Sequence, residues 1–258
     1  MPHTKHSAVT VVTYNIHKGL SHFNRRLVVH DIRERLEAMR ADVVFLQEVQ
    51  GAHQKHSDRH LDWPEEPQHE FLAGNATFEA EVVHTAYGMN AVYQHGHHGN
   101  AVLSRHPILT AENTDISHHA LESRGMLHCE LAVKGWDDPL HCVNVHLGLW
   151  ARSRKLQIEQ IAERIRAEVP DGAPLVLAGD FNDWRGTASR QLAQALGMIE
   201  VFEHMHGSPA RSYPARMPML TLDRIYVRGL KVASAECHGG RAWQRLSDHL
   251  ALSATLTR

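Results

Sequence analysis

Short runs of apolar residues alternate with longer amphipathic stretches along the whole chain. Residues 9–14 and 42–47 are two such runs, rich in β-branched side chains, and each is typical of a buried strand. Between them, residues 26–39 repeat apolar side chains, among them Ile32 and Leu36, at the spacing of one helical face. The N-terminal part of the chain therefore predicts a strand, a helix and a second strand.

The same two periodicities predict the elements of the rest of the chain. Further strands are expected at residues 91–93, 100–104, 125–133, 140–146, 174–178, 221–227, 231–236 and 250–256, and further helices at residues 150–168 and 187–196. The strands between residues 91 and 146 follow one another with no helix between them, which favours antiparallel pairing. The sum predicts an α/β fold of two packed mixed sheets with helices on the outside.

One long stretch has no such pattern. Residues 51–71 are mostly polar, contain Pro64 and Pro67, and show no clear period. Such a stretch predicts a long surface loop. Loops of this kind often shape access to a site, and Trp63 gives this one an aromatic side chain.

The chain of 258 residues, 43 % of them hydrophobic, is long enough to bury a core as one domain. No linker of biased composition and no internal repeat divides it, so we expect a single domain over residues 1–258, with residues 1–8 as a disordered tail. The N-terminal segment lacks the apolar run of a signal peptide, and no later segment reaches the roughly 18 apolar residues of a membrane span. We therefore expect a cytoplasmic protein.

The formal net charge is -2, with all 23 histidines counted as neutral. Protonation of about a quarter of the histidines at pH 7 moves the net charge to about +3, so its sign near neutrality is open. Either charge is small, which argues against a protein that holds nucleic acid mainly through a strong positive field.

Two residue types common in metal sites do not predict one here. The histidine clusters are too short to define zinc ligands by spacing; they are His95, His97 and His98, and His118 with His119. The cysteines show neither a zinc pattern nor a CxxC motif, so we expect reduced, buried thiols; they are Cys129, Cys142 and Cys237.

Isolated polar residues fall at the carboxyl ends of predicted strands, where side chains leave the sheet and can converge. These polar residues, each given with the motif that contains it, are Asn15 in TYNIHKG, Glu48 in LQEV, His146 in NVHLG, Asp180 with Asn182 in GDFND, Asp223 in LDRIYV, and Asp248 with His249 in LSDHLAL. Taken singly, each has a structural explanation, such as a turn cap, an Asx turn or a local ion pair. Their joint order is what indicates a functional site.

These motifs, in this order, resemble those of the endonuclease/exonuclease/phosphatase superfamily over nearly the whole chain. GDFN together with SDH is highly specific, whereas LQE alone is a weak signal. The superfamily includes DNase I, apurinic endonucleases, inositol polyphosphate phosphatases and neutral sphingomyelinases, and the resemblance implies their four-layer α/β sandwich. The variants NIHKG, QEVQGAH and GHHGNAVLSRHPI are similar to a bacterial branch related to proteins implicated in lipid-anchor remodelling.

The resemblance also implies a divalent metal, Mg²⁺ or Mn²⁺, bound by oxygen atoms. Glu48 is its expected main ligand, with Asn15 and Asp248 as neighbours. His249 is the expected base or phosphate-contacting imidazolium, and Asp223 is the carboxylate that fixes its tautomer.

Three further residues complete the implied catalytic set. Asp180 is expected to orient or deprotonate water or to assist the leaving group, Asn182 to donate its amide to a phosphate oxygen, and His146 to add a second donor. At His146 the chain has the choice of DNase I and the sphingomyelinases, whereas apurinic endonucleases have tyrosine. Arg152 and Arg154 either contact phosphate or lie on a solvated helix face.

We interpret the chain as a metal-dependent phosphodiesterase that hydrolyses phosphate esters by water attack, with a phospholipid headgroup or another small phosphodiester as substrate. The alternative is a Mg²⁺-dependent endonuclease or exonuclease acting on DNA or RNA, and a non-catalytic binding module of the same fold is a remote third interpretation. The partners expected are a phosphate-ester substrate, a membrane surface under the lipid interpretation, and nucleic acid under the nuclease interpretation. No obligate protein partner is inferred.

Overall fold

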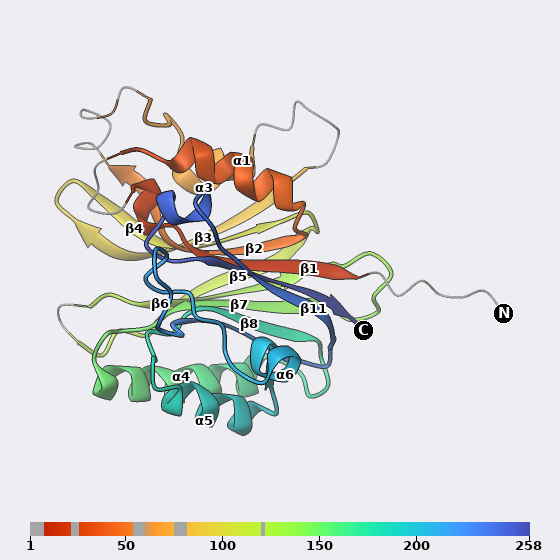
Figure 1. Ribbon diagram of the computed structural model, residues 1–258. Helices are drawn as coiled ribbons and strands as arrows, with labels where there is room; N and C mark the ends of the chain where they lie inside the picture. Colours follow the sequence, from red (N-terminus) through yellow and green to blue (C-terminus); the bar gives the residue numbers. More distant parts are fainter. Residues whose placement is uncertain (1–7, 22–25, 54–59, 61, 75–81, 120–121) are drawn as a thin grey trace.

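The computed structural model describes residues 8–21, 26–53, 60, 62–74, 82–119 and 122–258. Two six-stranded β-sheets pack face to face, with helices on the outer face of each (Figure 1). This arrangement confirms the predicted four-layer α/β sandwich. Residues 1–7 of the expected disordered tail lie outside the described residues. No helix in the described ranges is both long and apolar enough to cross a bilayer.

The first sheet has the order β11-β12-β1-β2-β4-β3. Its strands are β1 (Val9–Asn15), β2 (Val43–His53), β3 (His84–Tyr93), β4 (Gly96–Ser104), β11 (Lys231–His238) and β12 (Ala251–Thr257). β1 pairs in parallel with β2 and antiparallel with β12. The helices α1 (Val29–Met39) and α3 (Gln68–Ala73) cover the outer face of this sheet (Figure 1).

The second sheet has the order β5-β6-β7-β8-β10-β9. Its strands are β5 (Ile108–Asp115), β6 (Gly125–Leu131), β7 (Leu140–His146), β8 (Leu175–Asp180), β9 (Ile199–Glu200) and β10 (Asp223–Arg228). β7 and β8 run parallel, and the other pairings described in this sheet are antiparallel. The helices α4 (Ala151–Glu168) and α5 (Thr187–Leu196) cover its outer face, and α6 (Val201–His206) packs against β10 and β11.

β1 is buried on both faces, which explains its continuous apolar sequence. Val11 faces the opposite sheet in one cluster with Phe45, whereas Val12 packs beneath α1 in another cluster with Ile32. Alternate side chains of the strand thus contribute to two different cores. The register is fixed because a slip by one residue would exchange the two faces.

A buried polar contact joins the two sheets beside the bulge of β2 and close to the carboxyl end of β7. Asn144 donates its amide hydrogens to the carbonyl oxygens of Leu46 at 2.9 Å and Ala101 at 2.8 Å, and its Oδ1 accepts a hydrogen bond from Gln47 Nε2 at 2.8 Å. All the polar atoms of this buried side chain therefore have partners, as burial requires. The contact fixes the distance between the segments that follow it directly, which carry Glu48 on β2 and His146 at the end of β7.

The predicted loop over residues 51–71 is wrong at both ends. β2 continues through His53, because its last residues pair with β4 across two register shifts, and α3 begins at Gln68. β-bulges break the period of two, so the polar end of this strand has no alternating pattern. The part of the predicted loop at residues 54–59 and 61 lies outside the described residues.

Other boundaries also differ from the prediction. The helix expected over residues 26–39 begins at Val29, and the strand expected at residues 91–93 is the end of the longer β3. The sequence pattern misses β5, an edge strand with mostly exposed polar side chains, and α6, which has six residues. An exposed edge strand needs no apolar alternation, and a helix of two turns is too short to show its period.

The three cysteines are free thiols, as expected, but the expectation that all three are buried is wrong for Cys237, which is partly exposed. Cys129 and Cys142 are buried and lie opposite each other on β6 and β7. Burial raises the pKa of the Cys129 thiol to about 12. These thiols therefore stay protonated and act as small apolar side chains.

Candidate active site

Strand ends of both sheets meet at one edge of the sandwich and surround a cavity of about 290 Å³. The cavity is lined by Glu48, Arg124, His146, Leu149, Asp180, Asn182, Trp184, Tyr213, Leu220, Leu222, Asp248 and His249. Of the eight residues predicted for catalysis and metal binding, six line the cavity. The other two, Asn15 and Asp223, form hydrogen bonds with lining residues. The structure thus brings all eight side chains to one place.

Three of these residues precede a strand. Asp223 is the first residue of β10, and Asp248 and His249 come just before β12. They reach the cavity because β10 is antiparallel to β8, which places Asp223 opposite Asp180, and because β12 is antiparallel to β1. The expectation that each polar residue lies at the carboxyl end of a strand is therefore wrong for these three, and also for Glu48, which lies inside β2.

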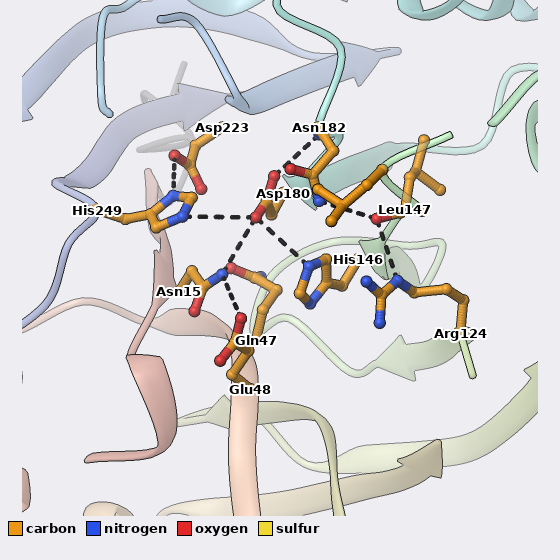
Figure 2. Close-up of polar contacts among 12 residues, drawn as sticks. Asn15, Gln47, Glu48, Arg124, His146, Leu147, Asp180, Asn182, Asp223 and His249 are labelled. Atoms are coloured by element: carbon orange, nitrogen blue, oxygen red, sulfur yellow. Dashed lines mark hydrogen bonds and ion pairs between the residues drawn. The ribbon is translucent and has the colours of Figure 1, made fainter. Parts of the chain in front are cut away.

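Asp180, the last residue of β8, is buried at the centre of the site, between two imidazoles (Figure 2). Its Oδ2 accepts a hydrogen bond from Asn15 Nδ2 at 3.1 Å and lies 3.5 Å from His146 Nε2 and 3.7 Å from His249 Nε2. Its Oδ1 accepts the backbone N–H of Asn182 at 2.9 Å. Both carboxylate oxygens are therefore held in fixed directions.

The backbone before Asp180 explains how the carboxylate reaches this position. Gly179 has a φ of 145°, and a Cβ there would lie 1.9 Å from the carbonyl oxygen of Val145, so the close pairing of β8 with β7 requires glycine.

Burial raises the pKa of Asp180 to about 6, with His249 opposing the rise and Asp223 adding to it. The group is ionised at neutral pH and still close to its pKa, which suits a proton acceptor.

His249 and Asp223 form the expected pair. His249 Nδ1 lies 2.8 Å from Asp223 Oδ2, and the hydroxyl of Ser212 donates to the same oxygen at 2.5 Å. Burial lowers the pKa of His249, but the carboxylates of Asp223 and Asp180 outweigh burial and raise this pKa to about 10. The imidazole is therefore a cation at neutral pH, with Nδ1–H donated to Asp223 and Nε2–H directed towards Asp180.

His146, the last residue of β7, approaches Asp180 from the other side with the opposite protonation state. Burial lowers the pKa of His146 well below its usual value, and the positive charges of Arg124 and His249 lower it further. His146 is therefore a neutral imidazole at pH 7. The central carboxylate thus contacts one charged and one neutral histidine.

Asp248 is held by the turn that follows β1. His17 Nδ1 lies 3.3 Å from Asp248 Oδ1. Burial raises the pKa of Asp248, but the hydrogen bond from His17 outweighs burial and the resulting pKa is about 2. The turn is left-handed, with φ of 46° at His17 and 61° at Lys18, and the hydroxyl of Ser247 donates to the carbonyl of Asn15 at 2.7 Å. Asp248 is therefore an anion at any pH at which the protein would work.

Glu48 lies at a β-bulge of β2. Its φ is 55°, and the register of β2 against β4 shifts between Leu46 and Val49. A bulge re-aims a side chain, and here the carboxylate of Glu48 reaches the cavity. Glu48 Oε1 lies 3.4 Å from Asn15 Nδ2, and Oε2 lies 3.7 Å from Lys18 Nζ.

The carboxylates of Glu48 and Asp248 fit a hard divalent cation that keeps several of its waters. Both line the cavity, and the side chain of Glu48 is 20 % exposed, so water can reach it. Asn15 presents its amide N–H to Glu48 and Asp180, while its Oδ1 accepts the backbone N–H of His17 at 3.1 Å. The donor chemistry therefore favours the two carboxylates as ligands and Asn15 as the residue that orients them.

A second group of possible ligand atoms lies deeper. Among the described residues, one atom each of Asp180, Asp223 and His249 lies within 4.8 Å of the others. Asp223 Oδ2 is shared between His249 and Ser212, whereas Asp223 Oδ1 is buried and has no hydrogen-bond partner in the described part of the chain. The short histidine clusters contribute to no group of this kind in the described part of the chain.

The two arginines at the start of α4 do not line the cavity. Arg152 is exposed. Arg154 is buried, donates to the carbonyl oxygens of Gly148 at 3.1 Å and Leu149 at 2.5 Å, and lies 5.1 Å from the centre of the Trp184 ring. These contacts brace the loop before α4.

Sequence reasoning missed two cationic side chains of the site, Lys18 and Arg124. Lys18 belongs to the quoted TYNIHKG motif, so a signal for it was present. Arg124 directly precedes β6, lines the cavity, and donates from Nε to the carbonyl of Leu147 at 3.1 Å (Figure 2). Its only signal is its place at the start of a strand antiparallel to β7, and that pairing is not visible in the sequence.

The fold and the site together define the class of protein. Residues 12–249 match the Endonuclease/Exonuclease/phosphatase family, so the chain belongs to this family and has its hydrolase fold, which confirms the resemblance. A full-length relative is YbhP of Escherichia coli strain K12, described as uncharacterized, which is 43 % identical over 253 residues and matches over 98 % of each chain. A UPF0294 protein of Yersinia enterocolitica is 38 % identical over 114 residues, which are 43 % of this chain and 38 % of that protein.

Solved structures share the architecture. The endonuclease/exonuclease/phosphatase of Beutenbergia cavernae superposes with a TM-score of 0.76 at 18 % identity, over 97 % of this chain and 71 % of that one. The human Nocturnin catalytic domain with bound sulfate superposes with a TM-score of 0.73 at 18 % identity, over 97 % of this chain and 94 % of that one. D. rerio TDP2 complexed with a single-strand DNA product superposes with a TM-score of 0.69 at 16 % identity, over 98 % of this chain and 100 % of that one. At these identities the likeness shows the fold alone.

Proposed function

We propose that the protein is a divalent-metal-dependent phosphodiesterase that hydrolyses a phosphate ester by attack of water, with a phospholipid headgroup or another small phosphodiester as substrate. The observation that carries the proposal is the setting of Asp180. Its buried carboxylate has a pKa of about 6, lies 3.7 Å from the imidazolium of His249, and lines the same cavity as Glu48 and Asp248. Phosphodiester hydrolysis needs a proton acceptor for water and positive charge near the phosphate oxygens, and both are present.

Asp180 is the proposed base. Its carboxylate is fixed by Asn15 and Asn182, so one oxygen stays directed into the site. The oxygen of the attacking water forms the new P–O bond while the ester P–O bond breaks, and the water proton passes to Asp180 and then to solvent. The leaving oxygen takes a proton from solvent water, which balances the reaction.

His249 is the proposed charge donor to the phosphate. Asp223 keeps its ring protonated, so Nε2–H is available to a non-bridging oxygen. His146 and the amide of Asn182, which donates one hydrogen bond to Leu147, add neutral donors on the other side. A divalent cation held at Glu48 and Asp248 would offset the negative charge that builds on the same phosphate oxygens.

Hydrolysis of bis-p-nitrophenyl phosphate, followed as release of p-nitrophenolate, tests the metal part of this proposal. We expect EDTA to abolish the activity and Mg²⁺ or Mn²⁺ to restore it. Glu48→Gln should raise the metal concentration for half-maximal activity by at least about tenfold, because one hard oxygen ligand loses its charge. Glu236→Gln, an exposed change on β11, is the matched control. Full activity in EDTA would contradict metal dependence.

A nuclease is the second candidate function. D. rerio TDP2, which shares the fold, holds a single-strand DNA product, and Arg124 adds a cation to the cavity of this chain. A substrate panel at equal phosphate concentration decides between the two: phosphatidylglycerol, cardiolipin, sphingomyelin, inositol phosphates, plasmid DNA and RNA. A higher kcat/KM on nucleic acid would overturn the lipid substrate and keep the phosphodiesterase. No turnover of any substrate with metal present would favour a non-catalytic binding module.

A further inference from the structure

Three loops at the mouth of the cavity expose large apolar side chains. Fourteen large hydrophobic side chains are exposed in the described part of the chain, and six of them lie in residues 147–152, 183–186 and 213–222. These six, which we call the apolar rim, are Leu149, Trp150, Trp184, Met217, Met219 and Leu220, and they are between 36 % and 63 % exposed. Leu149, Trp184 and Leu220 also line the cavity, so the apolar rim and the candidate active site share one surface.

Arginines accompany the apolar rim. Arg152, Arg185 and Arg216 are exposed, and each lies within two residues of a rim side chain in the sequence. None of the three forms an ion pair with a residue in the described ranges. The acidic residue of these loops, Asp183, is buried and accepts two hydrogen bonds from Ser189. The exposed face of the three loops is therefore apolar and positively charged, with no exposed carboxylate.

The turn over residues 213–220 holds its methionines outward through contacts at its base. The backbone N–H groups of Met219 and Leu220 both donate to the carbonyl of Tyr213 at 2.8 Å. Ala215 is buried, and its N–H donates to the carbonyl of Asp248 at 2.7 Å. The turn is thus fastened to the candidate active site, and Met217 projects from a fixed base.

The other two loops are braced in the same way. Arg154 fastens the carbonyl of Leu149 and packs against the ring of Trp184, while Trp150 stacks on His119 with ring centres 5.9 Å apart. The two tryptophan rings thus have side-chain partners, and the backbone that carries the other members of the rim is held by hydrogen bonds. A cluster of this kind, ringed by polar groups, marks a contact surface for a partner.

We infer that the apolar rim, with Arg152, Arg185 and Arg216, docks on the surface of an anionic phospholipid bilayer and presents the cavity to lipid headgroups; this rests on the proposed phosphodiesterase activity. Indole rings favour the headgroup level of a bilayer, aliphatic side chains enter the boundary with the acyl chains, and arginines pair with anionic lipid phosphates. The charge and apolar character of the loops complement these layers.

A single-stranded nucleic acid would fit this surface less well. It binds through cations and through rings on which bases stack. Trp150 and Trp184 could serve in this way, but the four other members of the apolar rim have no ring. Aliphatic side chains at four of six positions favour a lipid surface.

Flotation of the full chain with vesicles tests the inference. The vesicles contain equal parts of phosphatidylcholine and phosphatidylglycerol, and EDTA is present so that binding is measured without turnover. Replacement of Met217→Gln together with Met219→Gln should lower the partition coefficient about tenfold, because two apolar side chains no longer leave water. Arg185→Gln and Arg216→Gln should each lower it about fivefold at low salt.

The control pair is Leu109→Gln with Met205→Gln, two exposed apolar side chains on β5 and α6 that do not line the cavity. This pair should float like the wild type, and thermal unfolding checks that each variant is folded. No flotation of the wild type, or equal flotation of the wild type and the methionine variant, would overturn the inference. Binding of a single-stranded oligonucleotide that depends on Arg185 but not on Met217, without flotation, would assign the surface to nucleic acid and overturn it as well.

Docking and catalysis can fail separately in these experiments. Flotation needs no turnover, and hydrolysis of bis-p-nitrophenyl phosphate needs no membrane. No flotation of the wild type together with normal hydrolysis would overturn the docking inference alone and keep the proposed activity. Flotation without hydrolysis of any substrate would keep the docking surface and remove the proposed activity.

Discussion

The centre and the mouth of the cavity are built in opposite ways. At the centre, Asp180 is buried, both of its oxygens accept hydrogen bonds, and the charges around it are fixed by partners such as Asp223. At the mouth, Trp184 and Met217 are exposed, and Arg216 forms no ion pair with the described residues. A buried charge is tolerated only with its partners in place, whereas an exposed apolar side chain is stabilised by what covers it. The centre is therefore organised before any ligand arrives, whereas the exposed side chains of the mouth would be covered only in the proposed contact with a bilayer.

The largest expected effect comes from breaking the centre. Asp180→Asn removes the proposed base while keeping an oxygen for the N–H of Asn182. We expect kcat on bis-p-nitrophenyl phosphate to fall about 10²–10⁴-fold, the usual contribution of general acid–base catalysis. Asp171→Asn, an exposed change between α4 and β8, is the control. Near-normal turnover of Asp180→Asn, with unfolding unchanged, would remove Asp180 from the proposed role.

His249→Ala should cost at least about 10²-fold in kcat, because the phosphate then loses its charged donor. His249 Nε2 lies 3.7 Å from Asp180 Oδ2, so in the proposed mechanism the two residues would act on the same phosphate group. Groups that act as a unit are not additive in their effects. The double variant Asp180→Asn with His249→Ala should therefore lose little more than the worse single variant. If the fold-decrease in kcat of the double variant equals the product of the two single fold-decreases, the two residues work independently.

The centre was largely predictable from the sequence, and the mouth was not. Asn15, Glu48 and Asp180 are polar residues that interrupt apolar strands, and such interruptions stand out in a pattern. The sequence pattern does not show the direction of β10, so it places Asp223 at the wrong end of its strand. The pairing of Asp223 with His249 agrees with the prediction. Arg124 was missed because its role depends on a strand pairing across the sheet.

The apolar rim could not be predicted because exposure has no sequence signal of its own. Leu149 lies between a predicted strand that ends at His146 and a predicted helix that begins at Trp150, and the apolar residues from 217 to 222 resemble part of a core. Apolar periodicity reports that a residue can be buried, and only the packing decides whether it is. For the same reason the sequence pattern does not reveal β5. Its side chains are mostly exposed and polar, although its backbone pairs with β6.

The pH dependence of kcat/KM should show the two charge states of the centre. The carboxylate of Asp180 must be ionised to accept a proton, so activity is expected to fall about tenfold per unit as pH drops below about 6. The imidazole of His249 must be protonated, so activity should also fall as pH rises above about 10. Asp223→Asn removes the charge that holds the proton on His249, and the alkaline limb should move to lower pH by about one unit or more. An alkaline limb that does not move would separate Asp223 from the charge state of His249.

The smallest expected effect concerns Arg154, which connects the two regions. Arg154→Met removes hydrogen bonds to two loop carbonyls and the cover of Trp184, so the free energy of unfolding should fall by about 1–3 kcal/mol. KM for bis-p-nitrophenyl phosphate should not change, because the guanidinium does not line the cavity. Arg152→Met, an exposed change two residues earlier, should alter stability by less than about 0.5 kcal/mol. A raised KM for Arg154→Met with unchanged stability would contradict this prediction and would indicate that Arg154 contacts the phosphate of the substrate.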